Sequence, residues 1–127
     1  EADRMATRYI EGLAPDTAAM RVRELLLKAM SSGDLDQDGI ALALNQSAST
    51  LQRRLRREGT TYQRVLDTTR RELALEYLRE GRHTLADITF LLGFADQSNF
   101  TRAFRRWTGQ TPREFLTGQG DRLRESA

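Results

Sequence analysis

Cysteine is absent from this sequence of 127 residues, and histidine occurs once, as His83. Without cysteine the chain can form neither a disulfide framework nor a thiolate zinc site, and it has no cysteine nucleophile. One histidine gives little basis for a histidine metal site or a Ser-His triad. We therefore expect no metal and no cofactor. His83, which lies beside Gly81 in a predicted loop, is interpreted as a solvated residue.

Long apolar runs are also missing. No run approaches the roughly 18 residues of a membrane span, and nothing at the start resembles a secretory signal, so no membrane contact is expected. Carboxylate pairs remain possible by number, because the sequence holds 18 acidic residues. Pairs such as Glu72 and Glu76 lie among arginines on an outer helix face, which favours ion pairing over catalysis. The sequence therefore predicts no enzyme.

The net charge of +2 conceals an uneven distribution. Residues 1–46 hold five basic and eight acidic residues, a sum of −3, whereas residues 47–127 hold fifteen basic and ten acidic residues, a sum of +5. All fifteen basic residues of the second part are arginine. Arginine is suited to phosphate and bidentate contacts because its guanidinium is a planar fork that stays charged. The distribution indicates a polyanionic partner without naming it.

Helical periodicity dominates the sequence and no stretch alternates like a strand, so we predict an all-α fold. The expected helices cover residues 17–30, a short stretch from about 36, then 48–58, 61–80, 85–92, 97–107 and a short segment from Pro112. Asp36 and Ser47 can cap the helices that follow them, and Thr84 with Asp87 resembles a capping box. Gly39 lies inside the second helix, at a cost of roughly 1 kcal/mol relative to alanine.

The chain contains an internal repeat. Ile40 and Leu44 correspond to Ile88 and Leu92 at an offset of 48, and the arginine-rich segment that follows recurs at an offset of 49. Each unit is a short helix, a tight turn and a second helix, which is the layout of a helix-turn-helix. Asn45 stands in the first turn where Gly93 stands in the second. Asparagine tolerates a left-handed backbone better than most residues, so both turns fit a positive φ.

The second helix of each unit has a buried and a polar face. At about 100° per residue, Leu51 and Leu55 share one face in the first unit, as Phe100 and Phe104 do in the second. Phe94 and Trp107 are expected to join that aromatic core. The opposite faces carry Ser, Gln, Asn and Arg, and such side chains can read base edges in DNA. The long helix at 61–80 would span roughly 30 Å, and successive major grooves on one face lie roughly 34 Å apart.

These residues resemble the DNA-binding domain of the AraC/XylS family of bacterial transcription regulators. The signature in the second unit is Ile88–Phe100, ITFLLGFADQSNF, followed by Arg102–Pro112, RAFRRWTGQTP. In the first unit it is Ser47–Leu55, SASTLQRRL, with the Glu58–Thr60 turn. The match covers roughly residues 17–116, and it departs from the family pattern at Asn45, where glycine is usual, and at Gly39. Both departures could leave the first unit less rigid.

The resemblance implies about seven helices, forming two helix-turn-helix subdomains at 17–60 and 81–118 that are joined by a linker helix at 61–80. Residues 1–16 are expected to be a linker or the remnant of a missing N-terminal domain, and residues 119–127 a flexible tail. The family's function implies a cytoplasmic, nucleoid-associated activator or repressor that binds promoter DNA and contacts RNA polymerase. Dimerisation or effector binding would lie in the missing N-terminal domain.

The resemblance also assigns DNA contacts, position by position. It implies base contacts from Ser49, Gln52, Arg53, Gln97, Ser98, Asn99 and Arg102. It implies phosphate contacts from Ser47, Arg56, Arg57, Arg105 and Arg106. The departures at Asn45 and Gly39 remove none of the base-contacting residues.

Two other classes of function are considered. An RNA-binding helical domain could also use arginine-rich helices, but the duplicated units and the lack of exposed aromatic residues argue against it. A helical protein-interaction module should present apolar faces rather than Arg and Gln. Sequence-specific binding of double-stranded DNA is therefore the leading hypothesis.

Overall fold

The computed structural model of this protein describes residues 17–32 and 36–118. Within them the chain is all helical and contains no strand. The helices are α2 (Ala18–Ala29), α3 (Gln37–Ala43), α4 (Ala48–Arg57), α5 (Tyr62–Glu80), α6 (Leu85–Leu91), α7 (Gln97–Thr108) and a last helical segment at 112–118. A short 3-10 segment, Met30–Ser32, follows α2. The expected all-α fold is confirmed. The predicted linker at 1–16 and tail at 119–127 lie outside the described residues.

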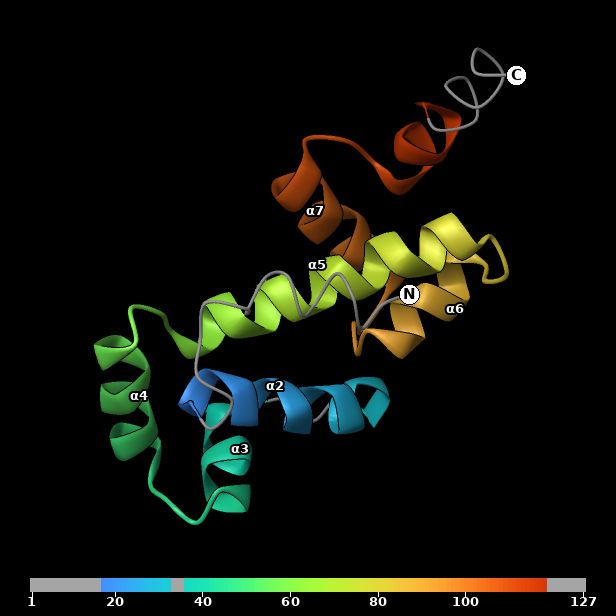
Figure 1. Ribbon diagram of the computed structural model, residues 1–127. Coiled ribbons are helices and arrows are strands. Elements are labelled where there is room, and N and C mark those ends of the chain that lie inside the picture. Colours follow the sequence, from blue (N-terminus) through green and yellow to red (C-terminus); the bar gives the residue numbers. More distant parts are fainter. Residues whose placement is uncertain (1–16, 33–35, 119–127) are drawn as a thin grey trace.

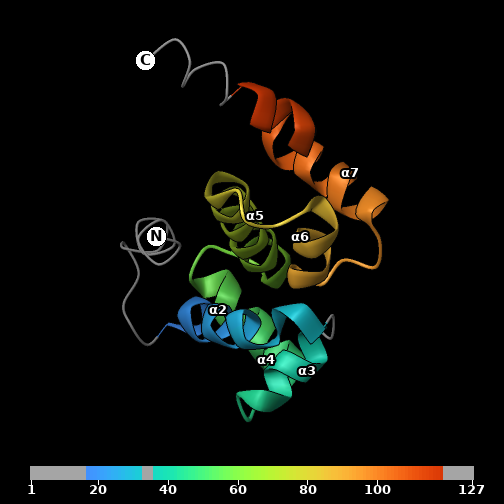
Figure 2. The same cartoon turned by 90° about the vertical axis from the view of Figure 1, so that its right-hand side faces the viewer.

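The long helix α5 lies at the centre of the molecule (Figure 1). α2 packs against it, α4 lies near its N-terminal end, and α6 and α7 lie toward its other half. A view from the side shows that α2, α3 and α4 lie on one side of α5 and α7 on the other (Figure 2). The 3-10 segment after α2 also contacts α6. The elements that precede α5 therefore touch those that follow it.

Side-chain caps determine where the helices begin. The Asp36 carboxylate accepts the Gly39 backbone N–H at 2.7 Å, and the Ser47 hydroxyl accepts the Thr50 N–H at 3.2 Å. Thr84 and Asp87 form a reciprocal capping box with both distances at 3.0 Å. Each bond satisfies a backbone donor that the first helical turn leaves without a partner. The three predicted caps are confirmed.

Glycine at position 39 has a specific role in this cap. A Cβ atom built at Gly39 would lie 2.8 Å from the Asp36 carboxylate oxygen that caps α3. A larger residue would have to push the capping oxygen away. Glycine lowers the intrinsic helix propensity at this position, but its missing side chain leaves room for the Asp36 carboxylate that caps α3.

The tight turn of each unit uses a left-handed residue, as the repeat predicts. Asn45 has φ 60° and Gly93 has φ 78°, and Asn45 is the one non-glycine residue with positive φ in the described chain. The amide of the next residue then bonds back into the leading helix: Gln46 to the Ala41 carbonyl at 3.0 Å, and Phe94 to the Thr89 carbonyl at 3.1 Å. The two turns therefore have the same hydrogen-bond pattern.

The cores of the two units differ in chemistry. In the first unit the aliphatic Leu51 and Leu55 are fully buried. The second unit buries Phe100 and Phe104 completely, with ring centroids 5.9 Å apart in an edge-on arrangement. Three half-buried aromatic rings surround them, belonging to Phe94, Trp107 and Phe115. The four aromatic residues predicted to form this core do contribute to it.

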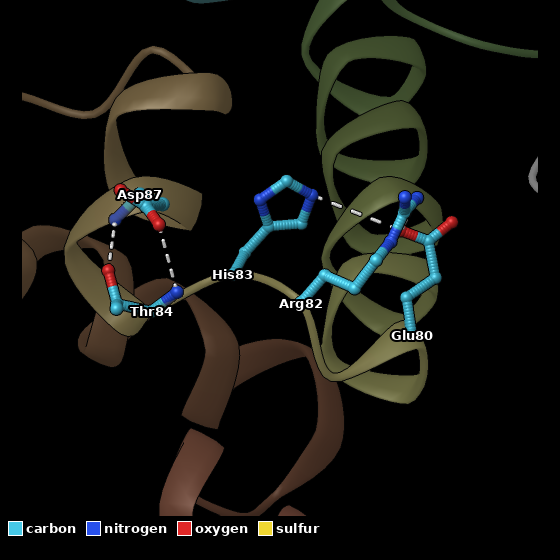
Figure 3. A network of polar contacts seen from close by, with 5 residues as sticks. All are labelled: Glu80, Arg82, His83, Thr84 and Asp87. Atoms are coloured by element: carbon cyan, nitrogen blue, oxygen red, sulfur yellow. Dashed lines mark hydrogen bonds and ion pairs between the residues drawn. The ribbon is translucent and has the colours of Figure 1, made fainter.

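His83 differs from its expected solvated state (Figure 3). Its ring packs edge-on against Tyr77 with centroids 5.0 Å apart, and its Nε2 atom lies 3.9 Å from a Glu80 carboxylate oxygen. The side chain is 28% exposed. The loop after α5 folds back along the last turn of that helix, which is why its histidine gains these neighbours. Burial next to Glu80 also raises the pKa of the Tyr77 hydroxyl.

Candidate nucleic-acid interface

The second helices of the two units, α4 and α7, carry the predicted contact residues. On α4, Leu51 and Leu55 are buried, while the predicted contact residues on the opposite face are exposed: Ser49, Gln52, Arg53, Arg56 and Arg57. Four arginines and no acidic residue lie within Ala48–Arg57. An amphipathic helix with this charge presents a basic polar face to solvent. Part of this face, lined by Arg53, Arg56 and Arg57, forms an open depression.

The same division holds on α7. Phe100, Ala103 and Phe104 are buried, and the exposed side carries Gln97, Ser98, Arg102, Arg105 and Arg106. Asn99 is half-buried at the edge of that face. Gln97, Ser98, Thr101 and Arg102 line one open depression, so three of the predicted base-contacting residues lie next to one another. The structure therefore brings the predicted residues of each unit together on a single helix face.

The first turn of each of these helices is held by a different cap. Ser47 caps α4, and its hydroxyl also donates to the Thr50 hydroxyl at 2.9 Å. Asp96 caps α7 by accepting the Asn99 N–H at 2.8 Å. The Ser47 hydroxyl, predicted to contact phosphate, is therefore already used as both donor and acceptor within the chain. Its contact with phosphate stays a prediction.

One predicted phosphate contact has a partner inside the molecule. The Arg106 guanidinium lies 3.7 Å from the Asp67 carboxylate of α5, although the Arg106 side chain is 62% exposed. Asp67 also accepts a hydrogen bond from Gln63 at 3.1 Å. An exposed ion pair of this kind is weak, so it does not prevent Arg106 from reaching another anion. No pattern in the sequence indicates that Arg106 pairs with a residue about 40 positions earlier.

Arg70 of α5 holds the turn of the second unit. Its Nε donates to the Leu92 carbonyl at 2.9 Å, its Nη2 donates to the Gly93 carbonyl at 3.3 Å, and its guanidinium carbon lies 4.2 Å from the centre of the Phe94 ring. Burial lowers the pKa of the Arg70 guanidinium, and the nearby Asp67 carboxylate partly offsets this shift. These contacts satisfy carbonyls at the end of α6. They fix the turn that leads into α7.

Arg70 was not among the predicted site residues, although its place in the sequence carries a signal. On the wheel of α5, Arg70 lies about 40° from Leu66 on one side and about 40° from Ala74 on the other, so buried apolar positions flank it. A charged group between two buried stripes needs partners, because an unpaired buried charge is costly. The pattern could have indicated a structural arginine. It could not have identified its partners.

Glu58 plays a similar part for the first unit. Its carboxylate, at the end of α4, accepts the backbone N–H groups of Ala18 at 2.8 Å and Ala19 at 3.0 Å. These are orphan donors of the first turn of α2, where a negative charge is favoured. The carboxylate therefore ties the C-terminal end of α4 to the N-terminal end of α2.

In residues 17–32 and 36–118, no three His, Asp or Glu side chains are grouped so that they could hold a metal ion. Over the same residues, no helix has the length and apolar character needed to cross a membrane.

Comparisons with known proteins agree with this arrangement. Residues 40–118 match the family described as the helix-turn-helix domain. Over 96 residues the chain is 49% identical to the ornithine utilization regulator of Pseudomonas aeruginosa, covering 75% of this chain and 28% of that protein. It is 37% identical over 118 residues to the HTH-type transcriptional regulator VirS of Mycobacterium tuberculosis, covering 91% and 35% of the two chains. The chain thus spans about a third of the length of these relatives.

A solved structure shows the same fold. The crystal structure of a DNA-binding transcriptional dual regulator from Escherichia coli K-12 superimposes with a TM-score of 0.75 at 25% identity, covering 83% of this chain and 94% of that one. The family match, the relatives and the superposition all agree with the repeat and signature found in the sequence. The chain belongs to the helix-turn-helix domains of AraC/XylS-type transcription regulators.

Proposed function

We propose that this chain binds double-stranded DNA in a sequence-specific manner and inserts α4 and α7 into successive major grooves of a promoter. The observation that carries the proposal is the basic polar face repeated on α4 and α7, one before and one after the long helix α5. α5 has 19 residues, which corresponds to a length of about 28 Å. A major groove admits an α-helix, and grooves on one face recur at about 34 Å.

Two subdomains follow from this proposal, at 17–60 and 81–118, with the helix at 61–80 between them. The supporting contacts are those of Glu58 with the start of α2 and those of Arg70 with the turn at Gly93. The first joins the end of α4 to α2, and the second fixes the turn that leads into α7. The two helices would therefore approach DNA as one body rather than as independent arms.

The division between base and phosphate contacts belongs to the same proposal. Ser49, Gln52 and Arg53 would read bases in the first unit, and Gln97, Ser98 and Arg102 in the second, because serine, glutamine and arginine can bond base edges. Arg56, Arg57, Arg105 and Arg106 lie toward the ends of their helices and would meet phosphates, with Ser47 at the start of α4. Phosphate contacts fix position and base contacts select sequence.

The relatives are longer than this chain. What the full regulator does is therefore also a proposal. We infer that a further domain of the full protein dimerises or binds an effector, and that the promoter-bound protein contacts RNA polymerase. The regulator would then act in the cytoplasm, on the nucleoid, where its DNA lies. These proposals rest on the greater length of the relatives and on their names, an ornithine utilization regulator and an HTH-type transcriptional regulator.

Gel mobility shift with the 127-residue chain tests the central proposal. Duplex DNA, single-stranded DNA and RNA of the same sequence are compared at two salt concentrations, after a preferred duplex has been selected from a random pool. We expect preference for the selected duplex. Equal binding to all three nucleic acids would favour the RNA-binding alternative. No binding at low salt would favour the protein-interaction module and overturn the proposal.

Two variants separate the roles of the arginines. Arg102→Ala should cost roughly 1–3 kcal/mol on the selected duplex and relax the preference at one base pair, most simply a guanine. Arg56→Ala should weaken binding to all duplexes and lower the salt slope by about one. A uniform loss in Arg102→Ala would make Arg102 a phosphate contact. An unchanged slope in Arg56→Ala would place Arg56 away from DNA.

A further inference from the structure

The two DNA-facing helices repeat a pair of side chains at an interval of three residues. In α4 the Arg53 Nη2 donates to the Thr50 hydroxyl at 3.4 Å. In α7 the Arg102 Nη2 donates to the Asn99 amide oxygen. Asn99 corresponds to Thr50, and Arg102 to Arg53, at the offset of 49 that relates the two helices. Each arginine proposed to read a base is therefore held by the residue three positions before it.

The supporting residue is itself anchored in both helices. The Thr50 N–H is bound by the Ser47 cap, and the Asn99 N–H is bound by the Asp96 cap. Thr50 and Asn99 are both half-buried, whereas Arg53 and Arg102 are exposed. The position three residues after the cap thus offers an anchored oxygen to an exposed arginine. This arrangement restricts the arginine before any DNA is present.

The hydrogen bond to Arg102 also limits what Asn99 can do. Reading an adenine requires both the amide oxygen and the amide nitrogen of asparagine, one to accept from N6 and one to donate to N7. The Asn99 oxygen is turned toward Arg102 instead. Arg102 keeps four of its five N–H donors after this bond, enough for a bidentate contact with guanine. In this pair Arg102 therefore keeps donors to contact a base, and Asn99 holds Arg102 in position.

We propose that Asn99 is a positioning residue, which holds the Arg102 guanidinium toward a base edge and makes the second unit discriminate its base pair more strictly than the first. This inference rests on the proposed function. The first unit has the weaker version of the device, because the Thr50 contact is long at 3.4 Å and the same hydroxyl accepts from Ser47 at 2.9 Å. Thr50 is thus a matched internal comparison.

The expected effects follow from the freedom of the arginine. Immobilising one flexible side chain on binding corresponds to a factor of about 2 to 10 in affinity. Asn99→Ala should therefore lower the preference for the selected base pair by about 2- to 10-fold. Arg102→Ala, which removes the reader itself, should lower it by about 5- to 150-fold. Thr50→Ala should change the preference at the Arg53 base pair by less than about 2-fold.

The experiment measures dissociation constants of the whole chain and its variants on the selected duplex and on every single-base-pair change of it. If Asn99 positions Arg102, Asn99→Ala relaxes the same base pair that Arg102→Ala relaxes. Asn99→Asp, which keeps an oxygen for Arg102, should retain that preference while its added negative charge weakens binding overall. Because Asp96 caps a backbone N–H, the alanine variant keeps its helix start, and its thermal unfolding midpoint checks this.

The other outcomes overturn the inference and leave the proposed function distinguishable from it. Relaxation at a different base pair would mean that Asn99 reads a base itself. Equal weakening on all duplexes would make Asn99 a phosphate contact or a purely structural residue. If Arg102→Ala relaxes no base pair while the chain still selects a sequence, DNA binding stands and the positioning role fails. If the chain selects no sequence at all, the proposed function fails as well.

Discussion

The two helix-turn-helix units share a backbone plan but are fastened to the molecule in different ways. Both have a capped leading helix, a left-handed turn residue and a basic second helix. The first unit is tied at the far end of its second helix, through Glu58 to the start of α2. The second is tied at its turn, through Arg70 of α5. The two units therefore share a backbone arrangement, although different side-chain contacts stabilise each of them.

Corresponding positions make this difference concrete. Thr108 precedes the left-handed Gly109 in the second unit, as Glu58 precedes the left-handed Gly59 in the first. The Thr108 hydroxyl donates to the Phe104 carbonyl of its own helix at 2.9 Å. A long-range tie in one unit is thus a local bond in the other. The cores differ as well, aliphatic in the first unit and aromatic in the second. Each unit can therefore be weakened by changes that should spare its counterpart.

Truncating a core side chain should have the largest effect on the free energy of unfolding. Equal losses in the two units would show that their cores are equivalent. Phe100→Ala should destabilise the fold by about 4 kcal/mol, because it removes a fully buried ring from an aromatic cluster. Leu51→Ala at the matching position should cost about 3 kcal/mol. Urea unfolding of both variants measures the two values. A larger loss in Leu51→Ala would mean that the aliphatic core is the more tightly packed one.

Removal of Arg70 should have the next largest effect and should act on the second unit alone. Arg70→Met leaves the Leu92 and Gly93 carbonyls without their charged donor, at a cost of about 2 kcal/mol. Hydrogen exchange at the Phe94 and Gln46 amides, which occupy matching turn positions, shows which unit is destabilised. The Phe94 amide should lose protection and the Gln46 amide should keep it. Equal loss at both amides would show that Arg70 supports the whole fold rather than one turn.

Glu58→Ala is the converse test on the first unit. It leaves two N–H donors at the start of α2 without their carboxylate, so the expected loss of stability is about 1 kcal/mol. The change should expose the Ala18 and Ala19 amides to exchange and leave the Phe94 amide protected. Thr108→Ala is the matched control in the second unit. If it costs as much as Glu58→Ala, the long-range tie adds nothing to a local bond.

The smallest effect is expected at Gly39. Alanine there gains helix propensity of about 1 kcal/mol but displaces the capping Asp36 oxygen, at a cost of about 1 kcal/mol. The two contributions should cancel to within about 0.5 kcal/mol in thermal or urea unfolding. A full gain of about 1 kcal/mol would show that the cap moves aside freely. The first unit would then be held by Glu58 without help from this cap.

Local features of the fold were predictable from the sequence because their causes lie within a few residues. Caps at Asp36, Ser47 and Thr84, the left-handed turn at Asn45 and the buried face with Leu51 all follow from short-range patterns. Because the same patterns occur twice, the repeat then predicted two helix-turn-helix units. The predicted contact residues share helix faces for the same reason, since a face is fixed by spacing of three and four residues.

Contacts between distant segments were not predictable. Arg70 with Leu92, and Glu58 with Ala18, join residues 22 and 40 positions apart. The pairing of Arg106 with Asp67 and the packing of His83 on Tyr77 likewise depend on how helices and loops meet. A charge pattern states that a buried group needs a partner, but only packing decides which group is near. These contacts are therefore seen only in the three-dimensional structure, and not in the spacing of residues along the sequence.

Hydroxyl-radical footprinting of the chain on its selected duplex tests the central claim most directly. If α4 and α7 enter successive major grooves, two protected blocks should lie on one face of the DNA, about one helical turn of roughly 10 base pairs apart. Arg53→Ala should weaken one block and Arg102→Ala the other. A single protected block, or two blocks on opposite faces, would contradict the two-groove arrangement.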